Sequence, residues 1–217
     1  TEHLGAWERG PFHGPYAAVD GQDAPRARLK SKKTEQAHLS LAVPGLSSTH
    51  PDRYALDVLN TVLGEGMSCR LFLEIRERLA LCYDVHSYVS HFRDAGSAVI
   101  GAGVDPSKAQ PALRAILDEL TRLREGVPEP ELRKAKEFIK GRIQLRMEDT
   151  QAVSSWMGGQ ELLRGEILAV DAVLEAIERI TPDDLLRVAC DIFRPERLNL
   201  AVVGPYRSVD RFAKMLR

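Results

Sequence analysis

Hydrophobic and polar residues alternate in several short stretches of the chain, and this pattern predicts β-strands. The stretch AHLSLAV (37–43) alternates and then reaches Pro44-Gly45, which predicts a strand followed by a turn. The stretches CYDVHSYVSHF (82–92) and GSAVIGAGV (96–104) are rich in strand-forming residues, and the turn residues at 93–96 predict a hairpin between them. A buried strand is expected at LNLAVVG (198–204) and a short one near Arg28.

Other stretches carry apolar residues at the spacing of an amphipathic helix. Ser48 or Thr49 can cap the first helix, which the glycines at 64 and 66 end, and a second helix is expected from Ser68 to Leu79. Later helices are expected over 105–124, from Pro128–Pro130 onward, over 151–164 with a break near Gly158-Gly159, over 170–180, from Thr181 to near Phe193, and at the C-terminus.

The order of these elements predicts an α+β fold with a mostly antiparallel sheet and helices packed on one face. Strict alternation of strand and helix, as in a doubly wound parallel sheet, is lacking. Residues 1 to about 30 are rich in Gly, Pro and charge, which predicts an N-terminal connector (1–30) before a single domain (31–217).

Composition narrows the function classes. The chain has 217 residues and a net charge of -1, which argues against an electrostatic nucleic-acid partner. No apolar run approaches the roughly 20 residues of a membrane span, so we expect no membrane partner. The N-terminus lacks the pattern of a signal peptide, and the first residue is not Met, so we expect a processed product or a piece of a longer protein. The cytoplasm is the default compartment, with the periplasm or an organelle as alternatives.

The sequence offers no metal-binding motif. Cys69, Cys82 and Cys190 are far apart without a C-x-x-C pair, and buried structural thiols are expected. Among six histidines there is no H-E-x-x-H or H-x-x-E-H. His86 and His91 are an odd number of residues apart in a strand, which places them on opposite faces. We therefore expect no cofactor or metal in this chain.

Two features remain as candidates for chemistry. Gly64-Glu65-Gly66 precedes a helix whose backbone N–H groups could bind an anion, although a tight turn between helices explains it as well. Arg76 ends a predicted helix and Tyr83 begins a strand, and the short turn Leu79–Leu81 would bring the two together. Guanidinium and phenol are both hydrogen-bond donors that could hold a carbonyl oxygen or an oxyanion. A surface ion pair of Arg76 with Glu77 or Asp84 is the structural alternative.

The segment LGEGMSCRLFLEIRERLALCY (63–83) resembles L-G-x-G-M-S-S-R-L-F-x-E-[IV]-R-E-K-x-G-L-x-Y of the pitrilysin/insulinase-type zinc peptidases, which include mitochondrial processing peptidase. More specifically, it is similar to the C-terminal half of the bacterial processing-protease members. The resemblance extends from about residue 30 to 217 and includes residues 33–38, 52–56, 126–136, 180–185 and 200–204.

The resemblance implies a function. Members of this family have two homologous halves that close around a cavity, and the N-terminal half or a separate subunit carries zinc on H-x-x-E-H. The C-terminal half supplies an arginine and a tyrosine seven residues later, which reach the substrate carbonyl beside the metal. Arg76 and Tyr83 fall on those positions, as catalytic groups that act only with the partner half. The implied partners are that zinc-binding half and a peptide substrate.

Two departures from the family pattern matter. Ala80 stands where the family often has Gly, so a positive φ there would be strained. The chain also lacks the zinc motif and so is not competent for hydrolysis alone. We therefore expect the C-terminal half of a zinc metalloendopeptidase that takes part in proteolysis; the alternatives are a non-catalytic scaffold of the same fold or an unrelated α+β binding module.

Overall fold

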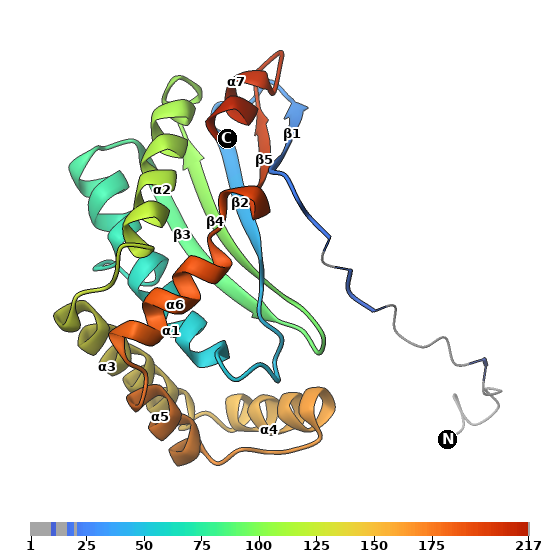
Figure 1. Cartoon of the computed structure of the whole chain (residues 1–217), viewed down its shortest axis with the longest axis vertical. Coiled ribbons are helices and arrows are strands. Elements are labelled where there is room, and N and C mark those ends of the chain that lie inside the picture. The colour runs from blue at the N-terminus through green and yellow to red at the C-terminus, as the bar shows by residue number, and fades with distance from the viewer. Residues whose placement is uncertain (1–9, 12–16, 20, 217) are drawn as a thin grey trace.

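A five-stranded mixed sheet organises the chain, and its helices gather on one side (Figure 1). The computed structural model describes residues 10–11, 17–19 and 21–216. The strand order is β1-β5-β2-β4-β3. The pair β1–β5 is parallel, and the pairs β5–β2, β2–β4 and β4–β3 are antiparallel. The expected α+β class with a mostly antiparallel sheet is therefore confirmed.

The elements of the described residues follow the order expected from the sequence. The strands are β1 (Arg26–Ser31), β2 (Ala37–Gly45), β3 (Cys82–His91), β4 (Gly96–Val104) and β5 (Asn199–Gly204). The α-helices are α1 (Arg53–Gly64), α2 (Ala109–Leu123), α3 (Glu129–Arg146), α4 (Thr150–Arg164), α5 (Val170–Glu178), α6 (Pro182–Ile192) and α7 (Asp210–Ala213). A π-helix, η1 (Phe72–Arg78), and three 3₁₀ turns, η2 (Pro106–Lys108), η3 (Pro195–Arg197) and η4 (Lys214–Leu216), complete the fold.

One face of the sheet is buried and the other is exposed. In β2, Leu39, Leu41 and Val43 are buried, whereas His38 and Ser40 between them are exposed. Neighbouring strands follow the same alternation because residues paired across a sheet share a face. We call the exposed side the open face. Strand pairing assigns the following residues to this face: Arg26, Arg28, Lys30, Asn199, Ala201, Val203, His38, Ser40, Ala42, Ser97, Val99, Gly101, Gly103, Asp84, His86, Tyr88 and Ser90.

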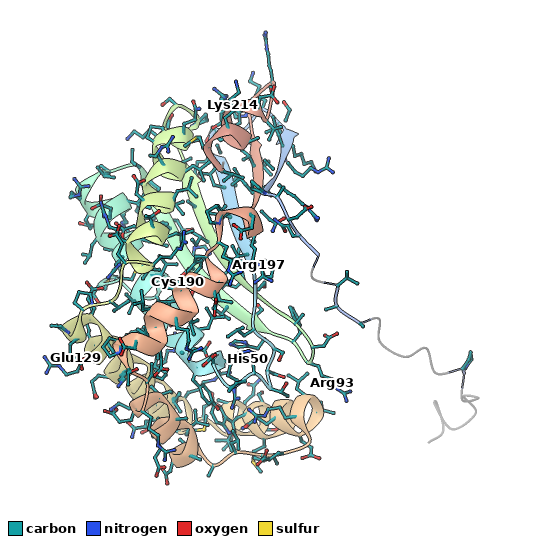
Figure 2. The ribbon with its side chains drawn as sticks, viewed as in Figure 1. His50, Arg93, Glu129, Cys190, Arg197 and Lys214 are labelled. Carbon is teal, nitrogen blue, oxygen red and sulfur yellow. The ribbon has the colours of Figure 1, made fainter. Side chains whose placement is uncertain are left out.

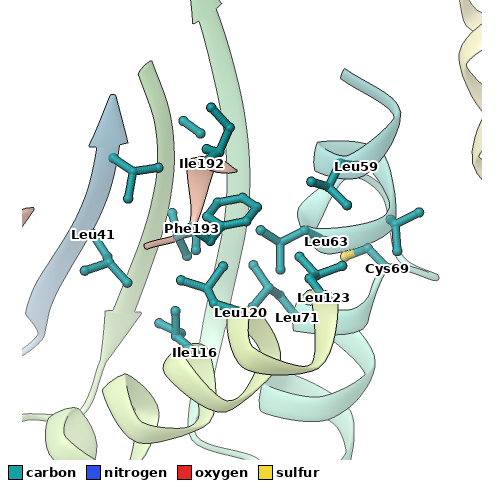
Figure 3. Close-up of a cluster of buried hydrophobic side chains, with 14 of the residues drawn as sticks. Leu41, Leu59, Leu63, Cys69, Leu71, Ile116, Leu120, Leu123, Ile192 and Phe193 are labelled. Atoms are coloured by element: carbon teal, nitrogen blue, oxygen red, sulfur yellow. The ribbon is translucent and has the colours of Figure 1, made fainter. Parts of the chain in front are cut away.

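The buried face packs against α1, α2 and α6 to form one core (Figure 3). Leu41 of the sheet, Leu59 and Leu63 of α1, and Ile116 and Leu120 of α2 all belong to this cluster. Fully burying such a side chain stabilises the fold by about 1.5–3 kcal/mol. The apolar stripe expected on the first helix is confirmed, since Leu56, Val58, Leu59 and Leu63 are all buried.

The start of the first helix differs from our expectation. Neither Ser48 nor Thr49 caps it; α1 begins at Arg53, and the N-cap residue Asp52 makes no capping hydrogen bond. The Asp52 carboxylate instead accepts two hydrogen bonds from Arg187 of α6, at 2.7 and 2.8 Å. This pairing lowers the pKa of Asp52, mainly through the hydrogen bond from Arg187. The carboxylate thus joins two helices and does not cap one.

The expected break at Gly158-Gly159 is wrong, because α4 runs without interruption from Thr150 to Arg164. Glycine weakens a helix by about 1 kcal/mol relative to Ala, but it keeps the N–H donor and clashes with nothing. Two capping features hold the ends of α4. Asp149 accepts from the backbone of Gln151 at 2.7 Å, and Gly165 closes the C-terminus with φ at 68°.

Half of the predicted connector, residues 1–30, lies outside the described residues, including His3 and His13. The expected strand near Arg28 is β1, which spans the predicted boundary at residue 30. Just before it, the Gln22 side chain donates to the Leu198 carbonyl at 3.2 Å and accepts from Asn199 at 2.8 Å. The division into a connector and one domain stays a prediction.

Among the described residues, no helix has the length and apolar character to cross a membrane.

His91 connects three parts of the fold near the end of the β3–β4 hairpin, whose tip carries Arg93 (Figure 2). Its Nδ1 lies 2.6 Å from the Leu46 carbonyl oxygen, and its Nε2 lies 3.2 Å from a carboxylate oxygen of Asp57 on α1. Only the protonated ring donates to both acceptors. Burial lowers the pKa of His91, but the hydrogen bond and charge of Asp57 outweigh it, so the pKa is raised.

We predict that this contact makes stability pH-dependent. A raised native-state pKa means that the contribution of His91 is fully present below about pH 6.5, the unfolded value, and is lost as the pH rises through the native pKa. The difference in urea unfolding free energy between wild type and His91→Gln should therefore be larger at pH 5.5 than at pH 8.5. His38→Gln, on the open face, serves as the control. An equal difference at both pH values would contradict the prediction.

Candidate functional site

Arg76 lies on a π-helix, an element the sequence did not predict. The expected helix at 68–79 is helical from Arg70 and changes to π geometry over η1 (Phe72–Arg78). Its last bond runs from the Leu79 N–H to the Glu74 carbonyl at 2.9 Å, five residues back. Such turns are rare, and many occur at functional sites because the extra residue redirects the side chains.

Between the end of this helix and the start of β3 lies a residue with a left-handed backbone conformation. Ala80 has φ of 47° and, among the described residues, is the one non-glycine with positive φ. The following N–H, of Leu81, donates to the Ile75 carbonyl at 2.9 Å, and the Lys108 ammonium donates to the Ala80 carbonyl at 2.8 Å. This is the closure that glycine usually provides at a helix C-terminus. The condition under which Ala would be strained at this position, a positive φ, is therefore met.

The turn brings Arg76 and Tyr83 together. The guanidinium carbon of Arg76 lies 4.6 Å from the centre of the Tyr83 ring and 4.7 Å from that of Phe72. Two aromatic rings therefore hold the cation in place. A looser ion pair joins Arg76 Nε to Glu77 at 3.6 Å. The Tyr83 residue is 78% exposed and the Arg76 side chain 34%.

The donors of this pair make no hydrogen bond within the described residues, although Arg76 Nε keeps its ion pair with Glu77 at 3.6 Å. Among the described residues, no group accepts a hydrogen bond from the Arg76 guanidinium or from the Tyr83 hydroxyl. Tyr83 lies at an irregularity in strand pairing between Cys82 and Asp84, where β3 carries an unpaired residue opposite β4. Such bulges commonly redirect a side chain at the edge of a sheet. Both donors therefore lie at the β3 edge.

Ion pairs connect the π-helix to α2. Glu74 pairs with Arg78 one turn later, and Arg122 of α2 lies 3.9 Å from Glu74 and also pairs with Glu119. The hydrogen bond from Arg78 lowers the pKa of Glu74, whereas burial raises the pKa of Glu119. This network therefore joins η1 to α2.

Cys82, between the two candidate residues, is not a nucleophile in this environment. Burial, together with the nearby Asp84 carboxylate, raises the pKa of its thiol to about 11. A reactive cysteine needs a lowered pKa, because the thiolate attacks. Burial likewise raises the pKa of Cys69. The expectation of buried thiols is confirmed for Cys69 alone, since Cys82 and Cys190 are half-buried.

The Gly64-Glu65-Gly66 segment is a tight turn. A Cβ at residue 64 would lie 2.2 Å from the Ser87 hydroxyl oxygen, so only glycine lets α1 approach β3 this closely. The Glu65 carboxylate accepts from Asn60 at 3.0 Å and Thr61 at 3.1 Å, and it pairs with Arg142. A negative side chain occupies this turn, which argues against the anion-binding alternative.

The described residues do not fit a zinc site. No three His, Cys, Asp or Glu side chains among them come together as a ligand set. His86 lies on the open face beside Asp84, at 3.4 Å, and His91 lies on the opposite face with Asp57. The expected separation of these two histidines on opposite faces is confirmed. Zinc ligands converge on one point, and these two cannot.

Comparison with known proteins identifies the family. The model described as "Peptidase M16 inactive domain" matches residues 1–139. The chain belongs to the peptidase M16 inactive-domain family. Curated relatives agree: an uncharacterized zinc protease of Streptomyces coelicolor is 43% identical over 185 residues, which is 85% of this chain and 40% of that protein. The uncharacterized zinc protease YmxG of Bacillus subtilis is 36% identical over 177 residues, 81% of this chain and 43% of that protein.

Solved structures share the fold. A protease from Helicobacter pylori superposes with a TM-score of 0.82 at 22% identity, over 91% of this chain and 48% of that one. A chain of complex III2 from Candida albicans gives 0.76 at 18% identity, over 89% and 49%. This chain thus spans about half the length of its curated relatives and of these structures.

Two supporting residues of the site were missed from the sequence. Phe72 lies one helical turn before Arg76, so the spacing that favours stacking was present in the sequence, but only the structure shows that the ring holds the guanidinium. Lys108 follows Ala80 by 28 residues and reaches its carbonyl from η2. No local pattern reveals such a contact.

We predict that Ala80→Gly raises the unfolding free energy by about 1 kcal/mol, because the removal of left-handed strain of roughly 1–2 kcal/mol outweighs the added unfolded-state entropy, which acts in the opposite direction. Urea unfolding measures the change. Ala172→Gly, at an exposed position of α5, is the matched control and should destabilise by about 0.5–1 kcal/mol. Destabilisation by Ala80→Gly would contradict the strain argument.

We also predict that the isolated chain binds no stoichiometric zinc, because its His, Cys and acidic side chains do not converge among the described residues. Metal analysis after incubation with zinc and gel filtration measures the bound ratio. Retention of one zinc per chain would overturn the interpretation of this chain as a half without a metal site.

Proposed function

We propose that the chain is the C-terminal half of a two-half zinc metalloendopeptidase, in which Arg76 and Tyr83 bind the substrate carbonyl. The observation that carries the proposal is the pair itself: two hydrogen-bond donors, side by side and without an acceptor among the described residues. The names of the curated relatives as zinc proteases support the reaction class.

The geometry suits the stabilisation of a developing oxyanion. Phe72 and Tyr83 hold the Arg76 guanidinium over their rings, so little freedom is lost when its N–H groups meet an oxygen. The Tyr83 hydroxyl offers a second donor. Donors fixed before the reaction stabilise charge more effectively than donors that must reorganise. We assign both residues to the substrate carbonyl or to the tetrahedral intermediate.

The same geometry requires a partner. The described residues include no metal ligand set, and the hydrogen-bond donors supply neither a nucleophile nor a general base. We propose that a homologous half, upstream in the same polypeptide or in a separate subunit, carries zinc and the base. The chain spans 40–43% of the curated relatives named here, which leaves room in those proteins for such a half. The substrate is a peptide that lies between the two halves.

A scaffold of the same fold is the second candidate. The structural match to a chain of complex III2 from Candida albicans supports it, because that protein shares this fold within a larger assembly. A scaffold has no need for two donors held without an acceptor. The pair Arg76 and Tyr83 therefore favours the peptidase half.

We predict that Arg76→Ala and Tyr83→Phe lower kcat for peptide cleavage when this chain is combined with a zinc-binding half. One oxyanion donor typically contributes about 2.7–4 kcal/mol, so each loss should reach about 10²- to 10³-fold. Steady-state kinetics on a fluorogenic peptide give kcat and KM separately.

Two substitutions on the helix side provide controls. Tyr54→Phe removes the hydroxyl of another tyrosine that stacks with an arginine, Arg53 at 4.1 Å, and Arg133→Ala removes an exposed cation. Both should leave cleavage unchanged, and circular dichroism checks that all variants fold. Normal turnover in Arg76→Ala and Tyr83→Phe would assign the pair a structural role and favour the scaffold.

A further inference from the structure

The open face is more basic than the rest of the chain. The whole sequence has nearly balanced charge, with 30 Lys and Arg against 31 Asp and Glu. On the open face, however, Arg26, Arg28 and Lys30 face the same way along β1, and Asp84 is the one carboxylate in register with them. Residues two apart on a strand share a face, so these three cations form a row.

The cations of this row lack a counter-charge among the residues that the structure describes. Arg26, Arg28 and Lys30 are all exposed, and no described residue forms an ion pair or a side-chain hydrogen bond with them. Other cations of the fold do have partners: Arg187, Arg70, Arg142 and Lys140 each pair with a carboxylate. Cations aligned without counter-charges attract a complementary anion.

The strands beside this row have short side chains on the open face. Ala201 on β5, Ser40 on β2 and Gly101 on β4 lie side by side in register. A Cβ at Gly101 would lie 3.1 Å from the His86 ring, and one at Gly103 would lie 3.3 Å from the Gln36 side-chain oxygen. The polar side chains of His86 and Gln36 therefore lie over glycines of β4, on the same face of the sheet as the cations.

We propose that the open face binds an extended segment of the substrate that carries acidic side chains, with Arg26, Arg28 and Lys30 as the residues that select for negative charge. This inference deepens the proposed function and rests on it, since it names the class of peptide that the two-half enzyme takes. An extended chain places alternate side chains on one side, at the same period of two residues as the cations of β1.

The position of the candidate catalytic pair agrees with this assignment. Asp84, the residue after Tyr83, is the first β3 residue in register on the open face. The exposed phenol and the guanidinium stacked on it therefore border the surface on which we place the substrate. A peptide on the open face lies on the same side of the sheet as Asp84; because β1 and β3 are the two opposite edges of the sheet, it must cross the strands to reach both the cations and the donor pair.

We predict that this chain binds a fluorescein-labelled peptide of about ten residues in which Glu alternates with Thr, and binds it more tightly than the same peptide with Gln or Lys in place of Glu. Fluorescence polarisation gives the dissociation constants. The affinity should fall as salt rises from about 0.01 M to 1 M, because the Debye length falls from about 30 to 3 Å. The double variant Arg26→Glu and Arg28→Glu should weaken binding by about tenfold or more.

The matched control is the double variant Arg114→Glu and Arg133→Glu, which makes the same charge change at exposed positions of α2 and α3. It should leave the affinity within about twofold of wild type, beyond the weak long-range effect of net charge. The variant Arg26→Glu with Arg28→Glu keeps the edge strand β1 charged. If the charge of β1 prevents this strand from pairing with other chains, that effect is therefore preserved. Thermal unfolding checks the fold, and Arg26→Gln with Arg28→Gln repeats the test without new charge.

Three results would overturn the inference: equal affinity for the Glu and Gln peptides, equal loss in the control variant, or binding of single-stranded oligonucleotides as tight as that of the acidic peptide. The last would indicate a general polyanion surface. A cleavage assay with the zinc-binding half separates this inference from the proposed function. If Arg76→Ala abolishes cleavage but reversal of Arg26 and Arg28 leaves the preference for acidic peptides unchanged, only the selectivity inference fails. If acidic peptides bind but Arg76→Ala and Tyr83→Phe cleave normally, only the proposed function fails.

Discussion

One-sided burial of the sheet is the constraint on which the rest of this molecule depends. Leu39, Leu41 and Val43 of β2 must face the helices, and the strict alternation of a strand then places His38 and Ser40 on the other side. A shift of one residue in pairing would move the leucines into solvent, so the register is strongly specified. The placement of the polar and basic side chains of the open face is a consequence of how the core is built.

The candidate site depends on a second, smaller constraint, the left-handed residue at Ala80. That turn converts the end of a helix into the start of a strand within three residues, and it is closed by the Leu81 N–H on the Ile75 carbonyl. The strain of Ala in this conformation is offset by the contacts around it, among them the Lys108 ammonium on the Ala80 carbonyl. Strain retained at one position is often found where function requires a fixed geometry.

Much of the fold could be predicted from local patterns because those patterns report on burial. The alternation in 37–43 and 96–104, and the apolar stripe of α1, each identify the face that meets the core. The spacing of Arg76 and Tyr83 across a short turn was also sufficient to predict their proximity, since the turn leaves little choice of distance. The family resemblance, and not the spacing, supplied the functional meaning of that pair.

What local patterns could not reveal depends on contacts distant in sequence or on backbone detail. Asp52 fails to cap α1 because Arg187, 135 residues later, takes its carboxylate. The break expected at Gly158-Gly159 does not occur, since glycine lowers helix propensity without removing a hydrogen bond. The π geometry of η1 adds one residue per hydrogen-bonded ring without changing composition, and no residue pattern distinguishes it from an α-helix.

The position of β5 has a consequence for how the chain reaches this structure. It lies between β1 and β2, yet it is the last strand in sequence. The first two strands cannot belong to one sheet until the polypeptide has been synthesised to about residue 204. Long-range pairing of this kind slows folding, because loop closure is unfavourable before the contacts that reward it can form. During synthesis, β1 would therefore wait as an unpaired, basic segment, and its charge would help to keep the nascent chain from associating with others.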